Sequence, residues 1–308
     1  MGKKVIQILL FVFLFTNLFA DETDNFTYSK VSQKDSYEVI NEKFNYYLQK
    51  GIDDANSKGK GNNKKVLYKA INKYITDRNF KDSITLDIYA DKNIDLINVK
   101  KEDSIYYNWN LVNGMSLGKK GTFMAGVINF NGIQIGIDKL EHMFRTGEIL
   151  FKLMDRGYKM EGILNKSRFL ERWFLGGNRI GASIISYGDL SANFNGIRLW
   201  NDMLKNYPDP LGREIPAYIA YENDKWILKN KVDLRNYVDY SLNERINPCI
   251  FSHKSSTKKF QNNEMVKALG AHHESLVSQY SVWATAENPY LTTLDLGVDP
   301  LNVESMPP

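Results

Sequence analysis

The sequence predicts an α+β protein that is mostly helical. Apolar residues recur at helical spacing within residues 35–80, and again within residues 138–154 and 190–204. Residues 215–229 instead alternate in the manner of a strand pair. Six glycines between residues 110 and 136 exclude one long helix in that stretch. Helical and extended segments therefore share the chain, and the helices are in the majority.

The composition is that of an ordinary globular protein with nearly balanced charge. Its 308 residues include 40 lysines and arginines against 36 aspartates and glutamates, which gives a net charge of +4. Hydrophobic residues make up 43% of the chain, enough for a core without covalent staples. So small a charge excludes strong non-specific binding to nucleic acid, and we expect no such partner. A single cysteine, Cys249, excludes an internal disulfide and a four-cysteine zinc site.

Residues 1–20 have the pattern of a secretory signal peptide. Lys3 and Lys4 precede an apolar run over residues 5–19, and the acidic, polar residues 21–24 follow Ala20. An uncleaved membrane anchor is the competing interpretation, because the run is only slightly short of a spanning helix. We favour cleavage after Ala20. The mature protein is then periplasmic or secreted and is not stably inserted in a membrane.

Residues 21–100 are expected to form an N-terminal helical extension. Two apolar patterns of helical period, at residues 37–48 and 66–75, predict two helices. A loop rich in glycine, asparagine and lysine separates them at residues 51–65. Residues 84–106 are partly β-branched, so we expect one or two strands there.

The main domain is expected at residues 101–288, followed by a weakly ordered tail at 289–308. Helices are predicted at residues 138–154, 161–177 and 190–204, and Pro208 and Pro210 stop the last of them. A hairpin is predicted within residues 215–229. Further helices are expected within residues 232–247 and 262–285.

Ionisable side chains concentrate at the start of the helix predicted at residue 138. Asp138, Glu141 and His142 share one helical face with Arg145, because residues three or four apart are neighbours on a helix. The opposite face is apolar, so the polar face borders both a core and a cleft. A carboxyl group at such a border is desolvated, as a general acid requires. The same spacing also fits a capped helix start with a solvated face.

The helix predicted at residues 190–204 begins with Asp189 in a capping position. Asp189 is a candidate second carboxylate, and Asn193 and Asn195 could bind sugar hydroxyl groups. A capped helix with its aromatic residues in the core explains the same pattern. Small residues, which allow close approach of a neighbouring helix, lie between the aromatic ones: Ser191, Ala192 and Gly196.

The predicted hairpin contributes further candidates. Alternation sends Tyr218 and Glu222 to one face and Tyr221 to the other, so either face could line a groove. Buried tyrosine rings with bonded hydroxyl groups are equally consistent with this pattern. No recognised zinc spacing, phosphate loop or nucleophile elbow is present, and we expect no metal or other cofactor.

Three segments together resemble one known family. They contain Asp138-Lys139-x-x-His142-Met143-Phe144 with Glu141, then Tyr187-Gly188-Asp189-Leu190-Ser191-Ala192-Asn193 with Arg198-x-Trp200, and finally Tyr218, Glu222-Asn223 and Trp226. In this order they resemble the peptidoglycan lysozymes of predatory bacteria that act on deacetylated cell wall, which have a goose-type-lysozyme-like fold. The resemblance covers residues 35–285. It implies a lysozyme-like catalytic domain that binds peptidoglycan glycan strands.

The resemblance also implies roles for individual residues. Glu141 would be the catalytic acid of a muramidase, with Glu148 as the fallback. A catalytic tyrosine is implied as well, for which Tyr218 is the best match and Tyr221 the rival. Substrate-binding roles would fall to Asp189, Asn193, Tyr221 and Glu222, with Glu222 and Asp189 offering negative charge to a cationic, deacetylated glycan.

Two other functions fit the sequence. A non-catalytic envelope protein could bind cell-wall glycan or a partner through aromatic grooves, and its role would survive replacement of Glu141. A metal-dependent hydrolase could use Asp138, Glu141 and His142, joined by the pair His272-His273, and would hold stoichiometric zinc.

Overall fold

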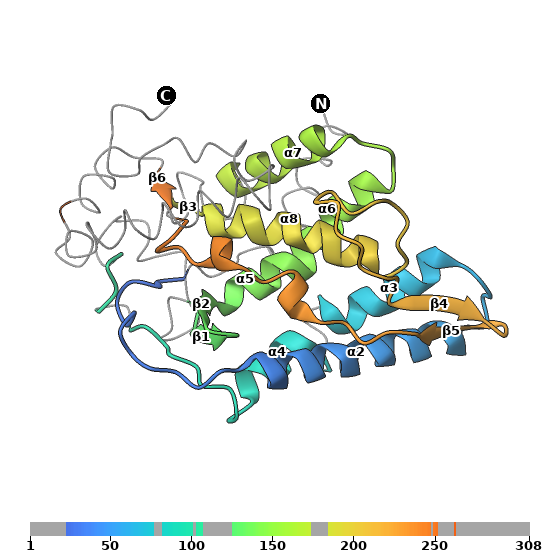
Figure 1. The fold of residues 1–308 in the computed structure, drawn as a ribbon, viewed down its shortest axis with the longest axis horizontal. Coiled ribbons are helices and arrows are strands. Elements are labelled where there is room, and N and C mark those ends of the chain that lie inside the picture. The colour runs from blue at the N-terminus through green and yellow to red at the C-terminus, as the bar shows by residue number, and fades with distance from the viewer. Residues whose placement is uncertain are drawn as a thin grey trace, which may run out of the picture.

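A computed structural model of the chain describes residues 23–76, 82–100, 103–106, 125–173, 184–247, 249–251 and 262. Within these ranges the protein is a helix-rich α+β fold, as predicted, with small two-stranded antiparallel sheets (Figure 1). The predicted signal peptide, the tail and the His272-His273 pair lie outside the described residues. In the part of the chain that is described, no helix has the length and apolar character needed to cross a membrane.

The two N-terminal helices confirm the predicted pair. Helix α2 (Tyr37–Ser57) packs against α3 (Lys64–Ile75), whose N-cap Asn63 accepts hydrogen bonds from the backbone N–H groups of Lys65 and Val66. Helix α2 extends into the predicted loop, and Gly51 lies where α2 contacts α3. A Cβ atom at Gly51 would lie 2.7 Å from the Cα atom of Ile71, so only glycine permits this approach.

Residues 84–90 correct one prediction. They form the short helix α4 (Ile84–Ala90) rather than a strand. Ile84 and Ile88 lie one helical turn apart and are both buried, which their β-branched character did not indicate. Nearby, Ile97 forms a single antiparallel bridge with Val127.

A hairpin leads directly into the helix that carries most of the candidate residues. Strands β1 (Val127–Phe130) and β2 (Ile133–Gly136) are joined through Asn131 and Gly132, both with positive φ, as a tight hairpin turn requires. Helix α5 (Ile137–Glu141), a π-helical turn η2 (His142–Thr146) and α6 (Gly147–Met154) then follow without a break. The helix predicted at residues 138–154 is thus confirmed, with an unpredicted π turn inside it.

Helix α8 (Tyr187–Asp202) crosses the middle of the molecule in the view of Figure 1, between α7 (Met160–Trp173) and α5. It was predicted at residues 190–204. Glycine permits its close contact with the π turn and α6: a Cβ atom at Gly196 would lie 2.2 Å from the Met143 carbonyl oxygen and 2.7 Å from the Gly147 Cα atom. The predicted role of small residues is confirmed at Gly196. Just before α8, β3 (Ile184–Ile185) pairs with β6 (Ile250–Phe251).

The second hairpin was also predicted correctly. Strands β4 (Ile219–Glu222) and β5 (Lys225–Leu228) pair around two residues of positive φ, and β5 packs against α2. Residues 232–247 form the 3₁₀ helices η3 (Leu234–Asn236) and η4 (Tyr240–Leu242), where a longer helix was expected. The side chains of Asp233 and Asp239 each accept the backbone N–H two residues on, which favours short turns.

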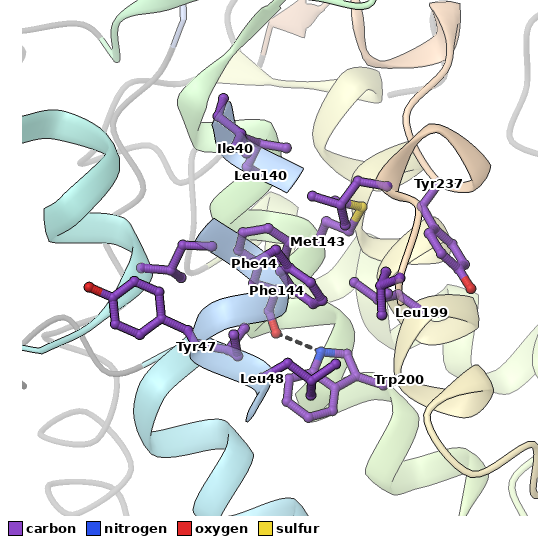
Figure 2. Close-up of a cluster of buried hydrophobic side chains, with 14 of the residues drawn as sticks. Ile40, Phe44, Tyr47, Leu48, Leu140, Met143, Phe144, Leu199, Trp200 and Tyr237 are labelled. Carbon is purple, nitrogen blue, oxygen red and sulfur yellow. Dashed lines mark hydrogen bonds between the residues drawn. The ribbon is translucent and has the colours of Figure 1, made fainter. Parts of the chain in front are cut away.

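One hydrophobic core joins the N-terminal helices to the rest of the described chain (Figure 2). Phe44 of α2 contacts Phe144 of the π turn, with ring centroids 5.0 Å apart. The Trp200 indole N–H donates to the Phe144 carbonyl oxygen at 2.8 Å, as the dashed line in Figure 2 shows. This bond ties α8 to the π turn, where the backbone departs from α-helical hydrogen bonding. The helices of the predicted extension are therefore packed into the same core as α5 and α8.

Candidate functional site

A buried lysine lies at the centre of the polar groups near the start of α8. The Lys139 ammonium nitrogen lies 2.7 Å from a carboxylate oxygen of Asp138, 2.7 Å from one of Asp189 and 2.6 Å from one of Glu244. All four side chains are at most 3% exposed. They come from α5, from the first turn of α8 and from the segment after η4. A buried ammonium group is tolerated only with such partners.

Hydroxyl groups donate further hydrogen bonds to two of these carboxylates. Thr23 donates a short hydrogen bond to Asp138, and Ser186 donates to Glu244 at 2.8 Å. The Ser186 oxygen also accepts the backbone N–H of Asp189, which caps α8. Gly136 is required beside them: a Cβ atom there would lie 2.0 Å or less from the Thr23 hydroxyl oxygen and from Asp138.

His142 extends this network towards α7. Its Nδ1 atom lies 3.1 Å from the side-chain oxygen of Asn193, and the Asn193 amide donates to Ser167 at 3.1 Å. Its Nε2 atom lies 3.3 Å from a carboxylate oxygen of Asp189. Glu171 of α7 is fully buried, and among the described residues it accepts only a long bond of 3.5 Å from the Ser186 backbone N–H.

We call this set the Lys139 network. Its members are Asp138, Lys139, His142, Glu171, Asp189, Asn193 and Glu244.

Burial raises the pKa of three acids of the network, Asp138, Glu171 and Glu244. It raises the pKa of Asp138 against the opposing effect of Lys139, and it raises the pKa of Glu244 to about 7. Burial, followed by the charge of Asp189, raises the pKa of Glu171 well above its usual value. Burial disfavours the ionised form of a carboxyl group, so the group keeps its proton to a higher pH unless a nearby cation stabilises the negative charge.

The structure brings several predicted residues together in this network. Asp189 and Asn193, predicted to bind substrate, join Asp138 and His142 there and are 2% and 0% exposed. Glu141, the predicted acid, lies in α5 between two members and is 9% exposed. The fallback acid Glu148 is buried in α6, where its carboxylate pairs with Lys152 at 2.5 Å and burial raises its pKa.

Tyr218 lies at the other end of α8. Its hydroxyl group is 3.0 Å from that of Tyr237, which donates to Asp202 at 2.8 Å. Asp202 closes α8, about 20 Å along the helix from Asp189 at 1.5 Å per residue. Tyr218 is only 2% exposed, and the structure does not bring its hydroxyl group to the Lys139 network.

Tyr221 and Glu222 lie away from the Lys139 network and from the Tyr218 hydroxyl group. Their hairpin packs against α2 at the end of the molecule away from β1 and β2 (Figure 1). The Tyr221 ring contacts Trp226 edge to face, with centroids 5.0 Å apart. Glu222 pairs with Lys229 at 2.6 Å on the surface.

Sequence reasoning assigned no role to three members of the network. Lys139 belongs to the segment Asp138-Lys139-x-x-His142, and its position between Asp138 and Glu141 could have indicated an ion pair with these acids. Glu171 and Glu244 gave no local signal, because they come from segments that meet α5 and α8 only in the folded chain.

No protein-family model, curated protein or solved structure matches the chain. The site is therefore defined by its geometry alone.

Proposed function

We propose that the protein is an exported peptidoglycan hydrolase of the lysozyme type, with Glu141 as its general acid. The proposal rests on the resemblance of the three segments and on one observation, the partial exposure of Glu141. It is 9% exposed, whereas its neighbours from Asp138 to His142 are at most 2% exposed. A general acid must reach its substrate from a sheltered position.

The Lys139 network supports this role by fixing the backbone on both sides of Glu141. Lys139 is held by Asp189 and Glu244, and His142 is held by Asn193. Glu141 lies between these two anchors, immediately before the π turn, a local geometry often found at functional sites. These anchors are positioning residues, since preorganised geometry lowers the cost of reaching the transition state.

The chemistry proposed is hydrolysis of the glycosidic bond between two sugars of a peptidoglycan strand. The Glu141 carboxyl group would donate its proton to the leaving oxygen while a water molecule attacks C1 from the opposite face. Glu222, with a side chain 43% exposed, and Tyr221 are proposed to contact the strand. Tyr218 has less support as a catalytic residue, because its buried hydroxyl group already bonds Tyr237.

The test compares the mature wild-type protein with Glu141→Gln on native and on chemically deacetylated peptidoglycan. We expect the wild type to clear at least one substrate and Glu141→Gln to clear it at least about 100-fold more slowly, the usual contribution of a general acid. Glu161→Gln, an exposed glutamate of α7, is the matched control and should clear at the wild-type rate.

Two outcomes contradict the proposal. Equal clearing by Glu141→Gln, with loss in Glu148→Gln, moves the acid to Glu148. No clearing by a folded wild-type protein that still co-sediments with peptidoglycan favours the non-catalytic glycan-binding alternative. Circular dichroism of each variant separates lost activity from lost folding.

A further inference from the structure

Three side chains of the Lys139 network form a second, distinct arrangement. His142 of the π turn, Glu171 of α7 and Asp189 of α8 each offer one ligand atom, and these atoms lie within 4.8 Å of one another. All three residues are at most 2% exposed. Three separate helical segments thus direct a nitrogen and two carboxylate oxygens to one buried point.

The hydrogen bonds of His142 leave its Nε2 atom without a proton when the ring is neutral. The Asn193 amide group donates to Ser167, so its oxygen faces His142 and accepts from Nδ1. The neutral ring then presents a lone pair on Nε2 to the Asp189 carboxylate at 3.3 Å. Two acceptors at that distance repel each other unless a positive charge lies beside them.

Glu171 shows the same deficit. Its Oε2 atom is buried and has no hydrogen-bond partner in the described part of the chain, and the same is true of Nε2 of His142. Its other oxygen has only the long bond from Ser186. A buried carboxyl group with so few hydrogen bonds is costly to desolvate.

The charges of the network point in the same direction. The Lys139 network contains four carboxyl groups and one ammonium group, and within the described part of the chain Glu171 forms no ion pair. Lys139 already fills the space between Asp138, Asp189 and Glu244. The uncompensated side is therefore the one formed by His142, Glu171 and Asp189.

We propose that His142 Nε2 and the carboxylates of Glu171 and Asp189 bind one divalent transition-metal ion, with Zn²⁺ as the probe of choice. One imidazole and two carboxylates suit zinc and similar ions better than calcium or magnesium, which prefer oxygen ligands alone. The 3.3 Å between His142 and Asp189 matches the edge of a tetrahedron with bonds of about 2.0–2.1 Å. Asn193 is the outer partner that orients a metal-bound histidine.

The ion would be structural. Its ligands are closed off from solvent, and it would clamp the π turn, α7 and α8 together beside Glu141. The site is independent of the lysozyme proposal, because it could stabilise the fold whether or not Glu141 is catalytic. It also differs from the zinc site considered from the sequence: Glu171 and Asp189 replace Asp138 and Glu141.

The test titrates Zn²⁺ into the metal-free, tag-free mature protein by calorimetry and counts bound zinc by mass spectrometry. We expect one Zn²⁺ per chain and a rise in the melting temperature. Glu171→Gln should weaken zinc affinity more than about 100-fold, and Asn193→Ala about 10- to 100-fold, as outer partners do. Glu161→Gln, an exposed glutamate on the same helix as Glu171, is the matched control and should bind zinc as the wild type does.

Absence of bound zinc in the folded wild-type protein would overturn the site. So would wild-type zinc affinity in Glu171→Gln, because the ion would then lie elsewhere in the chain. If a further variant, Glu244→Gln, loses zinc binding while Glu171→Gln keeps it, the ion lies among Asp138, Asp189 and Glu244 instead. If Glu171→Gln does not fold, the milder Asn193→Ala and Co²⁺ absorption of the wild type, which reports the ligand set, decide between these outcomes. Peptidoglycan clearing is measured separately, so failure of one proposal leaves the other testable.

Discussion

The two ends of α8 both bury charged groups, but they balance those charges differently. At its start, the Lys139 network contains four carboxyl groups and one lysine, and the lysine contacts three of them. At its end, Arg198 bonds Asp209 at 3.1 and 3.3 Å, and Asp202 accepts from Tyr237. We call the second set the Arg198 network; it comprises Arg198, Asp202, Asp209, Tyr218 and Tyr237.

The difference also shows in the atoms that have no hydrogen-bond partner. In the Lys139 network such atoms belong to His142, Glu171, Asp189 and Glu244, although the Asp189 oxygen still pairs with Lys139. In the Arg198 network the described residues leave only one, a terminal nitrogen of Arg198. A buried network with satisfied groups fixes the core, whereas unsatisfied groups indicate a place for a further ligand. The start of α8 is therefore the functional end in both proposals.

The largest expected effect is loss of the cation at the functional end. Lys139→Met leaves the carboxylates of Asp138, Asp189 and Glu244 without their shared partner, so we expect the free energy of unfolding to fall by about 3–5 kcal/mol. Urea unfolding followed by circular dichroism measures it. Lys229→Met, which breaks an exposed pair with Glu222, is the control and should cost less than about 1 kcal/mol. A similar small loss for both variants would refute the central role of Lys139.

A smaller effect is expected at the other end. Tyr237→Phe removes the hydroxyl group between Tyr218 and Asp202, so that the Oδ2 atom of the buried Asp202 carboxylate loses its tyrosine donor. We expect a loss of about 1–3 kcal/mol in the free energy of unfolding. Because the Arg198 network is structural in this view, peptidoglycan clearing by the folded variant should remain near the wild-type rate. Loss of clearing in a variant of normal stability would instead give the tyrosine pair a direct role.

The smallest effect concerns Glu148, a buried acid whose carboxylate pairs with Lys152. Burial raises its pKa above the ordinary value of 4.5. Below that pH both the folded and unfolded states are protonated. As pH rises through the folded-state pKa, the folded state loses stability relative to the unfolded one.

Glu148→Gln should therefore unfold with a free energy that falls less between pH 4.5 and pH 8 than that of the wild type. Urea unfolding at a series of pH values measures the difference, with Glu161→Gln as the exposed control. Parallel pH profiles for Glu148→Gln and the wild type would mean that Lys152 fully compensates the burial.

Local patterns in the sequence determined much of the architecture. Helices α2, α3, α8 and the run from α5 to α6 follow from apolar residues at helical spacing, and the second hairpin follows from alternation. Gly196 could be predicted as a contact point because a small residue among aromatic ones has few other uses in a helix. Asp138 and His142 could be predicted as neighbours because four residues make about one helical turn.

Tertiary structure alone decided the rest. Residues 84–90 became a helix because Ile84 and Ile88 pack on one buried side, a choice that a short β-branched run leaves open. The π turn changes which residues after Glu141 face the core, and no pattern in the sequence predicts such a turn. Periodicity identifies the buried face of a helix but not the distant segment that meets it. Glu171 and Glu244 therefore joined Lys139, His142 and Asp189 only when α7 and the segment after η4 packed around α8.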